Sequence, residues 1–264
     1  MINKINIHAG HGAKGSNSEG ASGYFNESEV NRQVLVKLKK LLNDNGKIYN
    51  DVTINNPKNA KHCLETIINR CNNSKSDLDV SIHFNYANDK NINGVECFVY
   101  SNESKAYKYA INVCKEINVL GFKNRGVKIN KDFKVLKTNN PCMIIECCFC
   151  SSVYDYKLLD VDKMALAIYK GIYGEEPKGK IKPKGILYKT SQDLICAEVL
   201  KWEKNDYEIQ HIDKHYLYEY ENLIVIGLGT NEIMKNRFDK ENYKLIGGQN
   251  RYETLKEVLK FINK

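Results

Sequence analysis

The sequence has 264 residues, 42% of them hydrophobic, and a formal net charge of +8. This length suffices for one large domain or two smaller ones, and no stretch reaches the roughly 18–20 uninterrupted apolar residues of a membrane span. The charge favours an anionic partner, which could be nucleic acid, a membrane surface or an anionic polymer of a bacterial cell wall. Because the lysines are scattered along the chain, we expect neither a nucleic-acid partner nor a membrane partner.

The N-terminus lacks the apolar run and the small-residue cleavage site of a secretory signal. We therefore expect the protein to be made in the cytoplasm without a signal peptide, so that any export takes another route. The sequence leaves the oligomeric state unknown.

Short strands alternate with helices over the first 175 residues. Strands are predicted where β-branched or aromatic residues gather between polar residues, at 4–9, 47–52, 78–84, 94–101, 133–137 and 142–149. Helical spacing of apolar residues fills the gaps, at 26–46, 58–71, 103–118 and 155–174, and Gly46 is predicted to cap the first of these helices. The alternation predicts an α/β domain with a twisted, mostly parallel sheet of about six strands flanked by helices.

Nine cysteines include the cluster Cys142, Cys147, Cys148 and Cys150 in one apolar segment. Disulfide frameworks belong to small secreted domains, so we predict buried, reduced thiols.

A change of composition at residues 173–185, "YGEEPKGKIKPKG", predicts a linker, which we place at 176–184. It separates a domain at 1–175 from a smaller α/β domain at 185–264. In the smaller domain the pattern predicts strands at 185–189, 207–212 and 222–229 and helices at 191–205 and 251–263.

Four residues of the first domain are candidates for chemistry. In α/β sheets, ligands and catalytic groups collect at the carboxyl ends of strands. His11, His83 and Glu146 follow or end predicted strands, and Glu27 stands at the head of the first helix. Two imidazoles and one carboxylate would complete a three-ligand zinc site with an open position, and the remaining carboxylate could act as a general base.

Each candidate also has an ordinary structural explanation. His11 lies in a glycine-rich turn, His83 could be a core histidine, and Glu27 would be favoured by the helix dipole alone. Glu146 is harder to explain in this way, because a carboxylate inside an apolar strand is costly unless it is paired or functional.

Four segments occur in the order of known motifs: "HAGHG", "NESEVN", "DVSIHFN" and "MIIECCF". In this respect residues 3–172 resemble the zinc-dependent N-acetylmuramoyl-L-alanine amidases of type 3, including endolysins of clostridial phages. The segment "NRGVKINKDFKVLKTNNP" is also similar to that family.

The resemblance implies that His11, Glu27 and His83 bind Zn²⁺ and that Glu146 is the catalytic general base. It also implies that peptidoglycan is the substrate. The family usually has an acidic residue near the position of His8, so the role of His8 stays open between support of a ligand and rival ligation.

The C-terminal segments "LIVIGLGTNEI" and "YKLIGGQNRYETLKEVLKFI" resemble the clostridial cell-wall-binding type 2 repeat. This resemblance implies a module that binds an anionic cell-wall polymer. As an alternative, Arg251, Tyr252 and Glu253 could simply cap and pack the last helix.

Together these features predict a peptidoglycan hydrolase that cuts the amide between N-acetylmuramic acid and L-alanine. The expected setting is an endolysin or a mother-cell enzyme that reaches the wall after holin-type or mother-cell lysis. Two alternatives stay open: a zinc peptidase that cuts within the stem peptide, and a non-catalytic cell-wall-binding protein.

Overall fold

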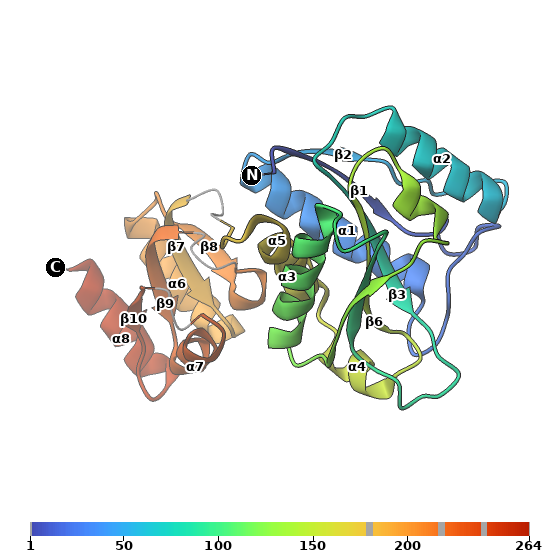
Figure 1. Cartoon of the computed structure of the whole chain (residues 1–264). Coiled ribbons are helices and arrows are strands. Elements are labelled where there is room, and N and C mark those ends of the chain that lie inside the picture. The colour runs from blue at the N-terminus through green and yellow to red at the C-terminus, as the bar shows by residue number, and fades with distance from the viewer. Residues whose placement is uncertain (1, 178–181, 216–219, 239–241, 264) are drawn as a thin grey trace. The chain divides into compact units, whose positions relative to one another are not determined.

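The computed structural model describes residues 2–177, 182–215, 220–238 and 242–263 (Figure 1). Its internal contacts divide the chain into two compact units, residues 1–177 and 178–264. The division falls inside the segment 176–184 predicted as a linker, of which residues 178–181 lie outside the described ranges. No helix in those ranges is long and apolar enough to cross a membrane.

The first unit is built on a six-stranded sheet in the order β2–β1–β3–β6–β4–β5. Its strands are β1 (Lys4–Ala9), β2 (Ile48–Asp51), β3 (Leu78–Asn85), β4 (Val95–Val99), β5 (Asn124–Ile129) and β6 (Cys142–Phe149). The neighbours β2, β1, β3 and β6 are parallel, whereas β4 is antiparallel to β6 and parallel to β5. The predicted fold, a mostly parallel sheet of about six strands with flanking helices, is confirmed.

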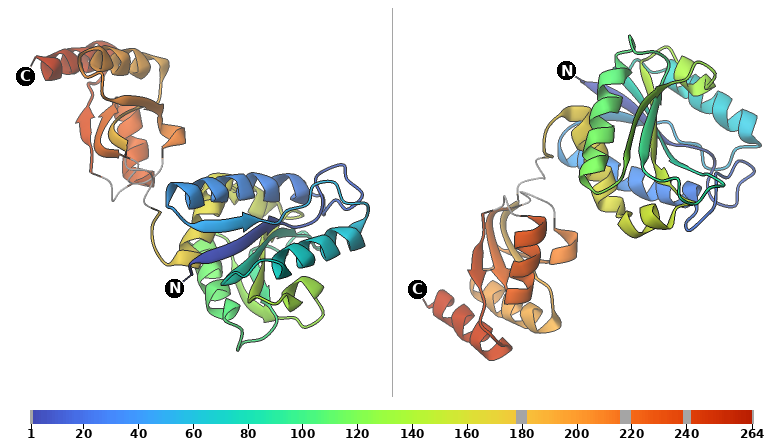
Figure 2. Two further views of the ribbon diagram at one scale, coloured as in Figure 1. Left: turned by 90° about the horizontal axis from the view of Figure 1, so that it is seen from above. Right: turned by 60° about the horizontal axis from the view of Figure 1, so that its bottom comes forward.

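Helices cover both faces of this sheet. They are α1 (Glu27–Asp44), α2 (Ala60–Asn72), α3 (Ala106–Val119), the 3₁₀ helix η1 (Lys134–Lys137), α4 (Val153–Leu158) and α5 (Val161–Tyr173). On one face α5 contacts both α1 and α3, and on the other α2 contacts η1. The right-hand view of Figure 2 shows the strands between α3 and α2.

Helix α1 illustrates how the sequence builds this core. Val34, Leu38 and Leu42 recur every four residues and are fully buried. The Asn26 side chain accepts a hydrogen bond from the backbone N–H of Glu29 and caps the N-terminus. Asn45 is the C-terminal cap, and Gly46, the predicted cap, follows it with a left-handed φ of 61°.

The predicted strand at 133–137 is wrong. Residues 134–137 form η1, in which the neighbours Val135 and Leu136 are both buried, whereas a strand would turn them to opposite faces. The sixth strand is β5 at Asn124–Ile129. It pairs only with β4 and buries none of its residues fully. Because such an edge strand can be polar, its composition did not indicate a strand.

The single helix predicted at 155–174 is also wrong, because two helices occupy the region. Asp160 has an extended backbone between α4 and α5, and its side chain accepts a hydrogen bond from the backbone N–H of Lys163. It therefore caps α5 and breaks the helical pattern.

All nine cysteines are buried and free, as predicted. Their pattern in β6 follows from the strand period, because Cys142 lies on the same face as Ile144 and Glu146 while Cys147 faces the other side.

The second unit is a smaller α/β fold with a parallel sheet in the order β10–β9–β7–β8. Its elements are β7 (Lys182–Tyr188), α6 (Ser191–Glu203), β8 (Glu208–His211), the 3₁₀ helix η2 (Ile212–Lys214), β9 (Tyr220–Ile226), α7 (Leu228–Arg237), β10 (Lys244–Ile246) and α8 (Arg251–Ile262). Helix α7 and strand β10 were not predicted from the sequence. The strand predicted at 222–229 ends at Ile226, where Gly227 turns the chain into α7 with a φ of 86°.

Candidate metal centre and catalytic site

The loop after β1 presents His11 in an unusual backbone conformation. Within the described ranges His11 is the one residue other than glycine with a positive φ, which is 60°. Helix α1 holds the loop, because the Asn31 side chain donates to the Gly10 carbonyl at 3.0 Å and an Nη of Arg32 donates to the His11 carbonyl at 3.0 Å. Such a conformation persists only where surrounding contacts fix it, which is typical of functional sites.

Glu27 is the first residue of α1, and its side chain is 4% exposed. Its carboxylate accepts hydrogen bonds from the backbone N–H groups of Ala21 at 2.9 Å and Phe84 at 3.1 Å. Burial alone would raise the pKa of Glu27, but hydrogen bonds from His11 and His83 outweigh it and hold that pKa well below its usual range. Glu27 is therefore a buried anion fixed toward two imidazoles.

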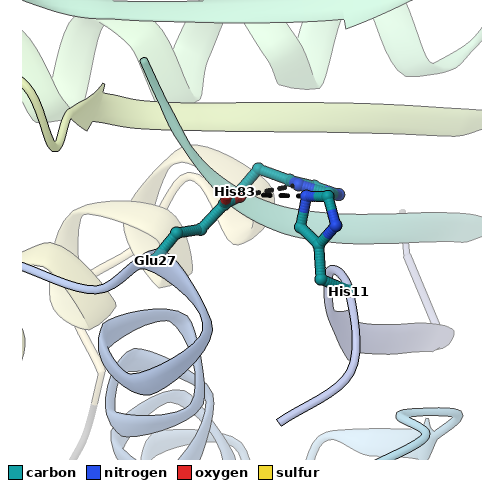
Figure 3. A group of neighbouring side chains, drawn as sticks. All are labelled: His11, Glu27 and His83. Atoms are coloured by element: carbon teal, nitrogen blue, oxygen red, sulfur yellow. Dashed lines mark hydrogen bonds and ion pairs between the residues drawn. The ribbon is translucent and has the colours of Figure 1, made fainter. Parts of the chain in front are cut away.

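His83 comes from β3 and completes a group with His11 and Glu27 (Figure 3). Its Nδ1 lies 3.0 Å from Glu27 Oε1, and His11 Nε2 lies 3.5 Å from Glu27 Oε2. One donor atom from each residue lies within 4.8 Å of the other two, and no other such group of three occurs in the described ranges. The structure thus brings together the three residues predicted as metal ligands.

Two glycines leave room for this convergence. A Cβ on Gly10 would lie 2.0 Å from His83 Cε1, and one on Gly20 would lie 2.5 Å from Glu27 Oε2. The donor set of two imidazole nitrogens and one carboxylate oxygen, with open space beside it, fits a catalytic zinc ion.

Glu146 lies beside this group, inside β6 and three residues before its end at Phe149, not at the end of its strand as predicted. It pairs in register with His83 on β3, so both side chains point to the same face of the sheet. Its Oε2 is buried and has no hydrogen-bond partner in the described part of the chain. Burial, followed by the charges of Glu27 and Glu96, raises the pKa of Glu146 well above its usual range.

Two further residues near the candidate site were not predicted from the sequence. Glu96 on β4 pairs directly with Glu146 and accepts hydrogen bonds from Arg125 and Lys128. A carboxylate inside the apolar segment "GVECFV" is the same signal that drew attention to Glu146, so Glu96 could have been found. Arg32, which holds the His11 loop, gave no comparable signal, because the backbone carbonyls of His11 and Ile54 that accept its hydrogen bonds are distant from it in the sequence.

A cavity of about 380 Å³ opens beside the metal-ligand candidates. His11, His83 and Glu146 line it, together with the apolar residues Leu64 and Ile67 of α2. His8 is 1% exposed at the cavity wall, and neither of its ring nitrogens has a hydrogen-bond partner in the described structure. Burial, followed by the charge of His83, lowers the pKa of His8 to about 3. His8 lies outside the three-residue group, so it is not one of the candidate metal ligands in the described structure.

The second unit has a cleft of its own, of about 510 Å³, at the N-termini of α6, α7 and α8. Asn250 caps α8 by accepting hydrogen bonds from the backbone N–H groups of Tyr252 and Glu253, and Glu253 accepts one from the backbone of Gln249. Glu253 thus stabilises the N-terminus of α8. Arg251 and Tyr252 are exposed along the cleft, with the guanidinium 4.8 Å from the tyrosine ring centre.

The sequence of the first unit matches a known protein family. The family model described as N-acetylmuramoyl-L-alanine amidase matches residues 5–174. An uncharacterized protein of Clostridium perfringens is 32% identical over 205 residues, covering 75% of this chain and 58% of that protein. A second Clostridium perfringens protein, also uncharacterized, is 34% identical over 176 residues, covering 64% of this chain and 50% of its own length. The chain thus spans about half the length of the curated relatives it matches.

Solved structures are also similar to the first unit. The catalytic domain of the CD27L endolysin targeting Clostridia difficile is 27% identical with a TM-score of 0.59, covering 66% of this chain and 98% of that domain. The catalytic domain of CwlV, an N-acetylmuramoyl-L-alanine amidase from Bacillus (Paenibacillus) polymyxa, is 26% identical with a TM-score of 0.55, covering 65% of this chain and 97% of its own.

Proposed function

The chain belongs to the N-acetylmuramoyl-L-alanine amidase family, and from this premise we propose that it is a zinc-dependent peptidoglycan amidase. It hydrolyses the amide bond between the lactyl group of N-acetylmuramic acid and L-alanine. The observation that carries the proposal is the convergence of His11, Glu27 and His83 next to Glu146, whose buried Oε2 has no partner among the described residues.

In this proposal His11, Glu27 and His83 hold the zinc ion. Zinc bound there would polarise the scissile carbonyl and lower the pKa of a bound water toward roughly 7. The hydrogen bonds of Glu27 to the backbone of Ala21 and Phe84 keep its carboxylate aimed at both imidazoles before any metal binds. Arg32 and Asn31 fix the loop that carries His11, so this loop needs little further ordering when zinc binds.

Glu146 moves the proton. Its Oε2 accepts a proton from the water that attacks the carbonyl and delivers it to the departing nitrogen of L-alanine. The raised pKa of Glu146 suits a group that must take up and return a proton near neutral pH. Glu96, held by Arg125 and Lys128, adds a negative charge beside it that sustains this basicity.

We propose further that the second unit, residues 185–264, binds an anionic cell-wall polymer in the cleft beside Arg251 and Tyr252. The N-termini of α6, α7 and α8 meet at this cleft, and helix N-termini favour anions. Residues 185–264 contain about as many acidic as basic residues, so binding must depend on this cleft and not on overall charge. The unit would raise the local concentration of enzyme on the wall.

The similarity to an endolysin catalytic domain supports a lytic role on the bacterial wall after release from the cytoplasm. A peptidase that cuts within the stem peptide would use the same zinc group. Mass analysis of digested peptidoglycan separates the two, because the amidase leaves a free L-alanine amino terminus and intact glycan strands. A non-catalytic wall-binding protein would have no need of a complete ligand set beside Glu146.

A further inference from the structure

Two buried polar side chains of the catalytic cavity play no part in the proposed chemistry. His8 on β1 and Ser81 on β3 are 1% and 0% exposed, and both line the cavity. Both ring nitrogens of His8 and the hydroxyl oxygen of Ser81 lack hydrogen-bond partners in the described part of the chain. A buried polar group without a partner is costly, so this pair calls for an occupant.

The register of the sheet places the pair relative to the chemistry. His8 pairs with Ser81, and Ser81 pairs with Ile144, so these residues form one row across β1, β3 and β6. His83 and Glu146 form the next row on the same face. Since a strand rises about 3.3 Å per residue, the two rows lie about 7 Å apart along the strands. A group bound at His8 and Ser81 would thus belong to the same substrate as the scissile bond.

The chemistry of the pair selects the occupant. A neutral imidazole offers one donor and one acceptor, and a serine hydroxyl offers both as well. An uncharged amide, with an N–H and a carbonyl, can satisfy such a pair, whereas a carboxylate has no donor and an ammonium group has no acceptor. Among the described residues, Lys134 is the one lysine or arginine that lines the cavity, and it is exposed, so no buried cation of this part of the chain favours a carboxylate there.

The remaining walls fit a small apolar appendage on that amide. Ile144 on β6, Leu64 and Ile67 on α2 and Val135 on η1 also line the cavity. A methyl or methylene group attached to the amide would lie against these side chains and lose its contact with water.

We propose that His8 and Ser81 form a subsite that binds an uncharged amide group of the substrate and so positions the scissile bond at Glu146. The proposal rests on the proposed function, because the amide belongs to a muramyl peptide. Two sources share this chemistry: the 2-acetamido group of N-acetylmuramic acid, and the amidated carboxyl of a D-isoglutamine in the stem peptide.

The test measures kcat/KM of the zinc-loaded full chain on three soluble substrates. These are N-acetylmuramyl-L-alanyl-D-isoglutamine, its analogue with a free amine in place of the acetamido group, and its analogue with D-isoglutamate. We expect about a 10- to 100-fold lower kcat/KM for the analogue that lacks the recognised amide, since the pair is then left unsatisfied. The analogue with the larger loss identifies the source, and equal rates on all three overturn the proposal.

Variants test whether His8 and Ser81 cause the difference in kcat/KM among the three substrates. His8→Leu and Ser81→Ala should lower kcat/KM for the parent substrate about tenfold and leave the recognised analogue nearly unchanged, so that the discrimination disappears. His8→Asn keeps a donor and an acceptor and should retain most of it. Ser18→Ala, which removes another hydroxyl from the cavity lining, is the matched control and should discriminate like the wild type.

The outcomes separate the two claims. If His8→Leu and Ser81→Ala slow all three substrates by one common factor, or keep the discrimination, the subsite is wrong while the proposed function stands. If the wild type releases no free L-alanine amino terminus from any of the three substrates or from intact peptidoglycan, the proposed function is wrong and the subsite falls with it. Circular dichroism and thermal unfolding establish that each variant is folded, and Ser81→Ala decides the matter if His8→Leu does not fold.

Discussion

Replacement of Glu146 by Gln tests the assigned proton transfer with little change of shape. The amide keeps the size of the side chain but cannot accept the proton of the attacking water. Loss of a positioned general base lowers kcat by about 10²–10⁴, which corresponds to about 3–5 kcal/mol of barrier. We expect a loss in this range for wall lysis and for cleavage of a soluble muropeptide.

The same substitution should not harm the fold or the metal group. Glu146 Oε2 has no hydrogen-bond partner in the described structure, and the neighbouring Glu27 and Glu96 disfavour its charge. Removal of this ionisable group should therefore leave the free energy of unfolding unchanged or raise it by about 1 kcal/mol. Zinc content should also be unchanged, because His11, Glu27 and His83 keep their contacts.

The assay combines turbidity of purified walls, zinc content by elemental analysis and thermal unfolding on the same preparations. Glu29→Gln is a matched control, because Glu29 is an exposed residue of α1 that pairs with Lys14. The control should retain wild-type activity.

Activity of Glu146→Gln within threefold of the wild type would refute the role of Glu146 as general base. Loss of zinc from this variant would refute the claim that Glu146 is not a zinc ligand.

Three further changes probe other parts of the account. Arg32→Met removes the donors to the carbonyls of His11 and Ile54 and should weaken zinc binding about 10- to 100-fold in a competition titration; unchanged affinity would contradict the role of Arg32 in holding the loop. Burial lowers the folded-state pKa of His8 to about 3, below the ordinary histidine value of about 6.5, so the unfolded chain binds the extra proton and the stability should fall as the pH drops from about 6.5 toward about 3. Compared with His8→Asn, the wild type should lose about 1.4 kcal/mol per pH unit more in denaturant unfolding between pH 6 and 4, and parallel pH profiles would contradict burial of a neutral His8. Arg251→Ala should reduce sedimentation of the full chain with walls and leave cleavage of a soluble muropeptide unchanged, whereas unaltered sedimentation would refute the cleft of the second unit as the polymer site.

Much of the fold could be predicted because its determinants are local. The helical spacing of Val34, Leu38 and Leu42 and the apolar runs of β1, β3 and β6 each specify their element within a short window. Strand β5 could not be found in this way, because an edge strand need not be apolar. Residues 134–137 were misassigned because two adjacent apolar residues fit a strand or a 3₁₀ turn equally well.

Some residues of the candidate site could be predicted from the sequence and others could not. His11, Glu27, His83 and Glu146 were candidates because they stand near predicted strand or helix ends, and their assigned roles came from the resemblance of the segments that contain them to family motifs. Arg32 could not be, since its function depends on carbonyls that only the fold brings near it. The role of His8 stayed open for a related reason. The sequence places His8 on a strand, but only the fold shows that it pairs with Ser81 and lines the cavity.

The most direct test of the central claim is the product mass from peptidoglycan digested by the full chain before chelation, after chelation, and after zinc is restored. We expect digestion to release stem peptides with a free L-alanine amino terminus and to leave the glycan strands intact. We also expect chelation to abolish this release and zinc to restore it. Cuts inside the stem peptide, or release that persists without the metal, would contradict the proposed zinc-dependent amidase activity.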